Sequence, residues 1–399
     1  MRLLNRSRLA LWAVALPFAL IVLFAGSRDV YWSGDFYLEV YPAYLALQHG
    51  FVDRFFDLLP GYSGFAVVIG APSALLAGAL GGMETMTYRF TAVPGLFALA
   101  ALGVAIAGPV KARGNHYWPV FVIAGAGGAL AYKTTLFGHP EDLLATALAI
   151  GAVMLARASR VNLATVALIG AIVSKQWAVL AILPAAMAAP RAGVRIALIS
   201  AFGTAALILL QTQEGSAAHG SITSTGVLFH PHQIWWPFGV PATPEFTAMG
   251  HGERMGPAWL APLVRPIIVG TGAVVATAWW VRSGPRRDKD DVFAVLALVF
   301  LLRCMLDPWN LVYYELPLVV ALAAWEARKG RDLPVLSVIA TAATWITFVT
   351  YDARTGNGPY FAYLAWSVPL ALGLGWHLLV KPIRLGSKEA GLVPAPTTA

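Results

Sequence analysis

Thirteen apolar runs follow one another along the chain, and they restrict its possible folds more than any other feature. Hydrophobic residues make up 58% of the 399 residues and charged residues only 12%, whereas a soluble domain carries about 25% charged residues. Repeated apolar runs of about 17–25 residues require the hydrocarbon core of a bilayer. The sequence therefore predicts an all-α integral membrane protein. The runs cover residues 9–25, 62–80, 90–108, 118–132, 141–156, 162–174, 177–189, 195–211, 261–281, 291–306, 311–327, 333–350 and 360–380.

One of these runs, residues 62–80, is predicted not to cross the membrane. Glycine and proline interrupt or flank it at seven positions, which suits a re-entrant or interfacial segment packed on protein. About 12 transmembrane helices then remain, and they place both termini on one side together with 19 of the 28 Lys and Arg residues. Basic loops mark the cytoplasmic side, so we expect both termini in the cytoplasm. The seven positions are Gly61, Gly64, Gly70, Pro72, Gly78, Gly81 and Gly82.

The domain organisation follows from this topology. We expect a single polytopic membrane domain over residues 1–385 and a disordered cytoplasmic tail over residues 386–399. Two long segments face outward, a first outer loop at 26–89 and a second at 212–260. The second is rich in His, Trp, Pro and Gly, a composition that favours an ordered lid or binding loop. The basic N-terminus and the first run are interpreted as an uncleaved helix, because so many apolar runs follow.

Charge and cysteine content narrow the function classes. The net charge of +8 is assigned to cytoplasmic loops, so no nucleic-acid partner is expected. The single Cys304 rules out an intrachain disulfide. His230-Pro-His232 has the spacing of a metal pair, but no third ligand is evident and a loop or substrate contact is the preferred interpretation. We therefore predict no bound metal and no other cofactor; a divalent cation is not indicated.

Polar residues gather at the outward ends of different helices. Ionisable groups at membrane depth cost about 2.5–3.5 kcal/mol each on insertion scales, which makes them functional candidates. Lys133 and Lys175 face the same side as Arg303, against the positive-inside trend, and this favours binding of an anion such as phosphate. The candidates are Asp35, Glu39, Lys133, His139, Glu141, Asp142, Lys175, His230, His232, Arg303, Asp307, Asn310, Tyr313, Tyr314 and Glu315.

Structural roles compete with each of these interpretations. Asp35 equally suits a helix N-cap before Phe36. Lys133 and Lys175, each considered singly, more often extend the amine to the membrane interface than bind an anion. His139 and Glu141 fit a turn that opens a helix with Pro140 at its first position.

Several of these residues together resemble a known family. An acid shortly after the first span (Asp35), the turn Gly138-His-Pro-Glu141 and a basic residue after the fifth span (Lys175) belong to the pattern. So do the second outer loop and the segment Arg303-x₃-Asp-Pro-x-Asn-x₂-Tyr-Tyr314. From about Arg8 to Trp325 the chain resembles the GT-C glycosyltransferases, and within them the bacterial polyprenyl-phosphate-mannose-dependent mannosyltransferases. A second acid directly beside Asp35, present in some relatives, is absent here, and Glu39 lies one helical turn away.

The resemblance implies an inverting sugar transfer at the extracytoplasmic face without a nucleotide. The expected donor is a polyprenyl-phosphate sugar, with mannose the first expectation and arabinose the alternative; the expected acceptor is a lipid or glycan. Asp35 would act as general base, and fixed cations would stabilise the departing phosphate. The expected phosphate-binding residues are Arg303, Lys175, Lys133 and His232. The expected substrate-binding residues are Glu39, His139, Glu141, His230, Asn310, Tyr313 and Tyr314.

Three other functions remain open on the sequence alone. A secondary transporter or lipid flippase explains many spans and intramembrane charges, but it predicts charges near the midplane in two related halves. A non-catalytic scaffold of envelope biosynthesis and a ligase or polymerase of lipid-linked glycans are the others. The Ala-, Gly-, Val- and Arg-heavy composition suggests a high-GC bacterium, and the expected location is its plasma membrane, with membrane lipid around the chain.

Overall fold

The fold is described from a computed structural model. It covers residues 2–28, 36–60, 64–82, 84–111, 118, 127–211, 228–241, 253–284, 288–350 and 357–380. Most of these residues are helical. The predicted tail at 386–399 and the proposed base Asp35 lie outside this part of the chain.

The N-terminal half contains helices throughout its described residues. A proline lies inside α1 (Pro17) and inside α4 (Pro72). In chain order the elements are α1 (Arg2–Gly26), the π-helix η1 (Phe36–Val40), α2 (Tyr41–Gln48), α3 (Val52–Asp57), α4 (Gly64–Ala79), α5 (Glu84–Lys111), α7 (Gly127–Leu136), α8 (Pro140–Arg157) and α9 (Val161–Ser174).

The C-terminal half adds three short strands that the sequence did not predict. They form one antiparallel sheet in the order β1-β3-β2, within the predicted second outer loop. In chain order the elements are η3 (Gln176–Ala181), α10 (Ile182–Ala188), α11 (Gly193–Gln211), β1 (Leu228–Phe229), η4 (Trp236–Phe238), β2 (Val240–Pro241), β3 (Arg254–Met255), α13 (Ala261–Ser283), η6 (Lys289–Asp291), α14 (Val292–Leu306), η7 (Val312–Glu315), α15 (Leu316–Arg328), α16 (Val335–Trp345), the π-helix η8 (Ile346–Thr350) and α17 (Gly358–Leu379).

Four of the described helices are long and apolar enough to cross a membrane. They cover Leu9–Gly26, Glu84–Gly108, Pro262–Ser283 and Gly358–Leu379. Shorter apolar helices cover Gly64–Ala79, Val161–Ser174, Gln176–Ala188, Gly193–Leu207 and Val335–Thr350. The prediction of a helical membrane protein is confirmed at this level.

Burial separates the helices into an inner and an outer set. Nearly every residue of α14 and α15 is buried in one large apolar cluster. A helix that is apolar all round belongs in the centre of a bundle. On the outer helices, large apolar side chains stand exposed, for example Phe202 on α11, Val274 on α13 and Leu372 on α17. These exposed side chains suit contact with lipid.

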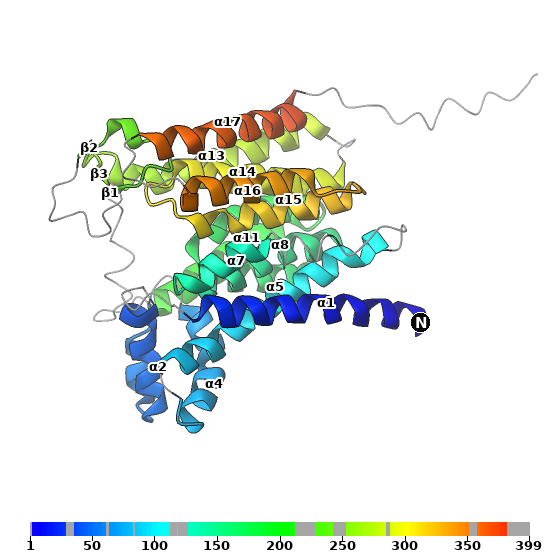
Figure 1. Ribbon diagram of the computed structural model, residues 1–399. Helices are drawn as coiled ribbons and strands as arrows, with labels where there is room; N and C mark the ends of the chain where they lie inside the picture. Colours follow the sequence, from blue (N-terminus) through cyan, green and yellow to red (C-terminus); the bar gives the residue numbers. More distant parts are fainter. Residues whose placement is uncertain are drawn as a thin grey trace, which may run out of the picture.

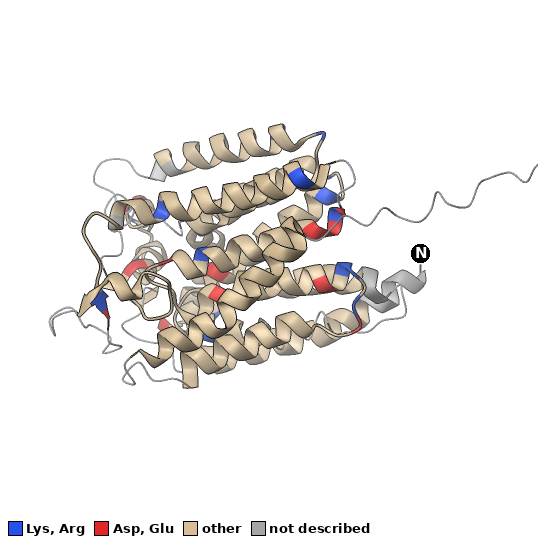
Figure 2. Ribbon diagram, turned by 90° about the horizontal axis from the view of Figure 1, so that it is seen from above, with Lys and Arg blue, Asp and Glu red and all other residues tan. Residues whose placement is uncertain are grey.

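The bundle has two distinguishable ends. Figure 1 shows that the start of α1 and the end of α17 lie at the same end, while the three-strand sheet lies at the other. The short helices α2 and α4 project from the side of the bundle near the sheet end. Long stretches of the helices carry no Lys, Arg, Asp or Glu (Figure 2). We call the end with the sheet the sheet end and the other the termini end.

The segment predicted to be re-entrant or interfacial is helix α4. Its sixteen residues would extend about 24 Å at about 1.5 Å per residue, less than a hydrocarbon core of about 30 Å. Glycines allow its close packing on α2, since a Cβ at Gly70 would strike the Tyr44 side chain and one at Gly78 would strike Gln48. Gln48 in turn donates to the Ala74 carbonyl (2.8 Å). Whether this segment crosses the bilayer stays a prediction.

Candidate functional site

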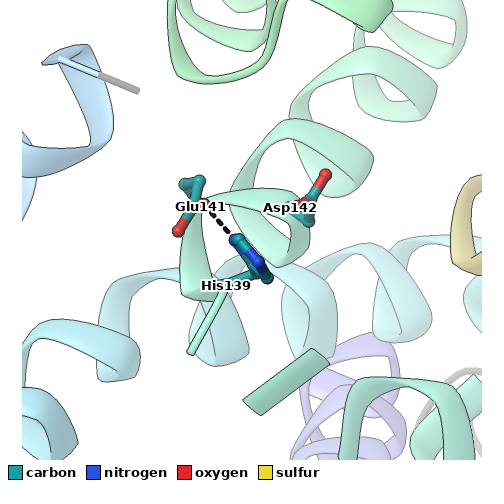
Figure 3. Close-up of side chains that lie close together, drawn as sticks. All are labelled: His139, Glu141 and Asp142. Carbon is teal, nitrogen blue, oxygen red and sulfur yellow. Dashed lines mark hydrogen bonds and ion pairs between the residues drawn. The ribbon is translucent and has the colours of Figure 1, made fainter. Parts of the chain in front are cut away.

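The start of helix α8 carries the centre of the candidate site. Gly138 adopts a positive φ of 82°, which glycine tolerates far better than other residues, and it turns the chain from α7 into α8. Pro140 follows at the first helical position, as predicted. Glu141 and Asp142 then lie in the first turn, where the helix dipole favours negative charge. Figure 3 shows these two acids beside His139 at the start of α8.

A buried lysine joins the two acids. The Lys175 ammonium lies 3.0 Å from Oε1 of Glu141 and 3.3 Å from Oδ2 of Asp142. His139 Nδ1 lies 2.9 Å from the same Glu141 oxygen, and the Trp177 indole donates to Oδ1 of Asp142 (2.8 Å). Lys175 therefore turns into the protein and does not extend to the membrane interface. This network of two acids and one lysine holds the loop between α9 and η3 against α8.

The same acids have the composition of a cation site. Ligand atoms of His139, Glu141 and Asp142 all lie within 4.8 Å of one another. Nitrogen and carboxylate ligands suit several divalent metals. The Lys175 ammonium, however, contacts both carboxylates, so a metal ion would have to displace it. The lysine thus supplies the positive charge that these acids require.

Arg303 forms the second cationic centre, near the end of α14. Its Nη2 lies 3.4 Å from Oδ2 of Asp307, and its Nη1 donates to the Tyr314 carbonyl (3.3 Å). The guanidinium lies over the Tyr314 ring, 4.1 Å from the centroid, and 5.7 Å from that of Trp177. Trp177 therefore lies between the two centres, bonded to Asp142 and facing Arg303. The sequence predicted Lys175 and Arg303 on the same side of the membrane, and in the structure Trp177 has contacts with both centres.

Helix η7 links the start of α8 to a second polar cluster. Tyr313 stacks on His139 with 4.6 Å between ring centroids. Asn310 donates to the His232 carbonyl (2.8 Å) and to Glu315 (3.2 Å). The Tyr363 hydroxyl donates to the same Glu315 oxygen (2.8 Å). Glu315 is fully buried, and the sequence analysis gave it no role, because only the tertiary structure brings Asn310 and Tyr363 to it.

The predicted histidines belong to a segment fixed on the turn after α14. The backbone N–H of His230 donates to the Pro308 carbonyl (2.8 Å), and that of Ile234 donates to the Met305 carbonyl (2.9 Å). The His230 ring is perpendicular to the Trp309 ring, with 4.3 Å between centroids, and His232 stacks on Phe348 of η8 with 3.9 Å between centroids. Both histidines are buried. The segment therefore covers the turn that follows Arg303.

Lys133 and Glu39 are two further predicted residues. Lys133 lies over the ring of Trp345, 5.4 Å from its centroid, and so faces α16. Its described ring contacts are with Tyr132 and Trp345. Glu39 is exposed on η1.

Asp35 lies outside the described residues, whereas its neighbour Phe36 lies within them. Phe36 packs its side chain against Tyr88 (4.6 Å between centroids), and a Cβ at Gly138 would meet the Phe36 Cβ at 3.1 Å. The first outer loop therefore enters η1 beside the turn that opens α8. From Phe36 to Gln48 the chain forms η1 and α2.

A pocket opens beside Glu141. It lies among η1, α2, α4, α5 and the start of α8, and Glu141 is its one ionisable acid among mostly apolar lining residues. Its lining residues are Phe36, Val40, Tyr44, Ala66, Val67, Thr91, Pro94, Gly95, Pro140, Glu141 and Leu144. The predicted Gly-rich segment thus contributes Ala66 and Val67 to a mostly apolar pocket that Glu141 also lines.

These features define a helical membrane protein with a buried charged site at the sheet end of its bundle. Comparisons with known proteins found no matching family model, no matching curated protein and no matching solved structure. The function is therefore argued from the site itself.

Proposed function

We propose that the chain is an integral membrane glycosyltransferase of the GT-C kind. It would move a sugar, mannose in the first instance, from a polyprenyl-phosphate donor to a lipid or glycan acceptor at the extracytoplasmic face. The observation that carries the proposal is a pair of cations on either side of Trp177: Arg303, which is buried, and Lys175, which contacts Glu141, a lining residue of a mostly apolar pocket. A lipid phosphate needs both features together, because its chain is apolar and its head is anionic.

Arg303 is the proposed principal ligand of the donor phosphate. A guanidinium offers five N–H donors and can bind two phosphate oxygens at once. Its acid partner, Asp307, has 21% of its side chain exposed and lies at 3.4 Å, a loose ion pair. The carboxylates Glu141 and Asp142 hold Lys175 more closely. An arriving phosphate would therefore displace Asp307 from Arg303 first, while Lys175 adds positive charge nearby.

Asp35 is the proposed general base. Phe36, the next residue in the chain, lies beside Gly138 at the turn into α8. The acceptor hydroxyl would give its proton to Asp35 while its oxygen bonds to the anomeric carbon. The bond from that carbon to the phosphate oxygen then breaks, and the polyprenyl phosphate leaves with the electron pair. One displacement of this kind inverts the configuration.

The topology proposed with this function has about 12 transmembrane helices, both termini in the cytoplasm and the sheet end outside a bacterial plasma membrane. The start of α1 and the end of α17 lie at the same end of the bundle (Figure 1), and this supports an even number of membrane crossings. Single cysteines at exposed Asp53 and Lys289, in a Cys304→Ser background, test it. A membrane-impermeant maleimide applied to whole cells should label Asp53→Cys and leave Lys289→Cys unlabelled. The reverse pattern would invert the proposed orientation.

The function itself is tested by sugar transfer in vitro. Purified protein in detergent receives radiolabelled polyprenyl-phosphate-mannose, parallel donors with other sugars, and a panel of lipid and glycan acceptors. Asp35→Asn and Arg303→Gln are run beside the wild type, and Asp53→Asn on the exposed surface of α3 is the matched control. We expect transfer to disappear in Asp35→Asn, to need much more donor in Arg303→Gln, and to persist in the control.

Each other result has a defined meaning. Transfer that survives Asp35→Asn would keep the enzyme class and move the base to Glu141 or Glu39. Unchanged donor affinity in Arg303→Gln would remove its assignment to the phosphate. Intact protein without transfer from any donor sugar would refute the proposal and turn attention to lipid transport in liposomes.

A further inference from the structure

Glu253 immediately precedes β3, the central strand of the three-strand sheet. Strand β1 pairs with β3 so that Leu228 faces Met255 and Phe229 faces Arg254. Continuing this register by one residue sets His230 opposite Glu253. Residues directly opposite in an antiparallel pair lie on the same face, with Cβ atoms about 4.5–5.5 Å apart. If the register continues beyond the two paired residues of each strand, the Glu253 carboxylate lies opposite a histidine of the candidate site.

The face on which these two residues lie follows from their neighbours. Phe229 packs with Trp236, Leu260 and Val264 in a small apolar cluster on one side of the sheet. Arg254 lies over the Trp236 ring on that side, 4.5 Å from the centroid. Side chains alternate between faces along a strand, so His230 and Glu253 belong to the opposite face.

That opposite face meets the turn after Arg303. The His230 ring contacts Trp309 at 4.3 Å, and its backbone N–H donates to the Pro308 carbonyl. Asn310 of the same turn holds the His232 carbonyl. The face of the sheet that carries Glu253 is thus the face turned toward the candidate site.

The carboxylate of Glu253 lacks hydrogen-bond donors in this structure. The residue is only 3% exposed, and neither Oε1 nor Oε2 has a hydrogen-bond partner among the described residues. Burying an acceptor without a donor costs free energy, and for a carboxylate the cost is larger. Other buried acids of the site have donors: Glu141 has His139 and Lys175, and Glu315 has Asn310 and Tyr363. The Glu253 carboxylate can therefore accept hydrogen bonds from the donors of a ligand.

We propose that Glu253 binds hydroxyl groups of the transferred sugar. Two carboxylate oxygens can accept from two neighbouring hydroxyls of a pyranose, and the aromatic Trp309 beside His230 offers an apolar face for the ring. Glu253 is then a specificity-determining residue. It binds the sugar hydroxyls, whereas Arg303 and Lys175 bind the phosphate. The inference rests on the proposed glycosyltransferase function and adds the residue that selects its donor sugar.

The experiment measures binding of two probes that differ only in the sugar. Farnesyl phosphate and farnesyl-phosphoryl-mannose, with glucose and arabinose analogues in parallel, are titrated calorimetrically into the full chain in nanodiscs. Wild type should bind one sugar-bearing probe at least tenfold more tightly than farnesyl phosphate. In Glu253→Gln this preference should fall at least tenfold while farnesyl phosphate binds as before. Glu253→Asp should restore part of it, and Asp57→Asn on the exposed face of α3 should change nothing.

The outcomes separate the two proposals. Wild type that binds none of the phosphate probes refutes the proposed function itself. Wild type that binds farnesyl phosphate but keeps its sugar preference in Glu253→Gln refutes the role of Glu253 alone. Equal loss of both probes in Glu253→Gln, with a lowered melting temperature, would make Glu253 a structural residue and would also overturn the inference.

Discussion

Helix α8 carries an ion-pair cluster at each of its ends, and the two clusters differ in burial. At the sheet end, Glu141 and Asp142 engage Lys175, with 5% to 12% of these side chains exposed. At the termini end, Arg157 pairs with Asp290 at 2.8 Å, with 26% and 19% exposed. The eighteen residues of α8 separate these ends by about 27 Å, close to a hydrocarbon core of about 30 Å. The two clusters therefore suit opposite surfaces of one bilayer.

The termini end ties several helices together with charges that remain partly in water. Lys329 contacts Asp288 and Asp291 at 2.7 Å each, and His377 and Trp325 also bond to Asp291. Partly exposed pairs are individually weak, because water and salt screen them. Buried pairs persist only when their geometry compensates for lost hydration, and removing one partner leaves an uncompensated charge. The ion pairs at the sheet end therefore depend more strongly on exact geometry than those at the termini end. Such buried charges are typical of functional sites.

Removing Lys175 should have the largest effect on stability. Lys175→Met leaves Glu141 and Asp142 buried without their cation, and breaking a buried pair in this way costs about 3–5 kcal/mol. We expect a strongly lowered unfolding temperature in detergent, followed by intrinsic fluorescence. A second variant, Lys175→Arg, keeps the charge and should recover most of the loss. Equal stability of Lys175→Met and wild type would show that the acids carry no charge in the folded protein.

Removing Asp291 should have an intermediate effect that depends on pH. Burial opposes its ionised form, but hydrogen bonds from His377 and Lys329 outweigh burial and lower the pKa of Asp291 from 3.8 to about 2. The ionised form therefore contributes stability above pH 3.8, and this contribution is lost as the pH falls toward 2. Asp291→Asn should cost about 2 kcal/mol at pH 7. The free energy of unfolding of the wild type and of Asp291→Asn, measured between pH 7 and 2.5, tests this prediction. A difference between the two that does not change with pH would contradict the lowered pKa of Asp291.

Replacing Gly138 should distort the sheet end through the backbone. Gly138→Ala places a Cβ at a positive φ and within 3.1 Å of the Phe36 Cβ. The left-handed conformation costs about 1–2 kcal/mol for a residue with a side chain. We expect this loss in the melting temperature and, if the proposed function holds, a larger loss of transfer, because the α8 turn and η1 shift together. Gly151→Ala, where a Cβ meets nothing within 4 Å, is the control and should be neutral or slightly stabilising.

Removing Lys329 should have the smallest effect. Burial opposes its charge, but hydrogen bonds to Asp288 and Asp291 prevail and raise the pKa of Lys329 above its ordinary value. Lys329→Met should nevertheless cost no more than about 1 kcal/mol, since one partner, Asp288, has 53% of its side chain exposed. High salt should shrink the difference between variant and wild type. A cost as large as that of Lys175→Met would erase the distinction between the two ends.

Local patterns were enough to predict much of the helical framework. The apolar runs predicted helices where α1, α5, α13 and α17 lie, and Gly138-His-Pro predicted the turn into α8. Lys175 was predicted only as a cation on the same side as Arg303. Its pairing with Glu141 and Asp142 depends on how α9 packs on α8, and residues 33 or 34 positions apart carry no local signal of contact. Glu253 had no signal for the same reason, since its neighbour His230 is met only through the strand register.

The sequence by itself determined that this protein is helical and suited to a membrane, because apolar run length and composition act locally and need no partner. It also determined which residue types are available for chemistry at the sheet end. Only the tertiary structure decided that Lys175 contacts two acids, that Lys133 turns toward α16, and that Glu253 is buried next to β3 without a hydrogen-bond partner among the described residues. Those outcomes depend on long-range packing, which determines both how deeply a side chain is buried and which charged groups lie next to it.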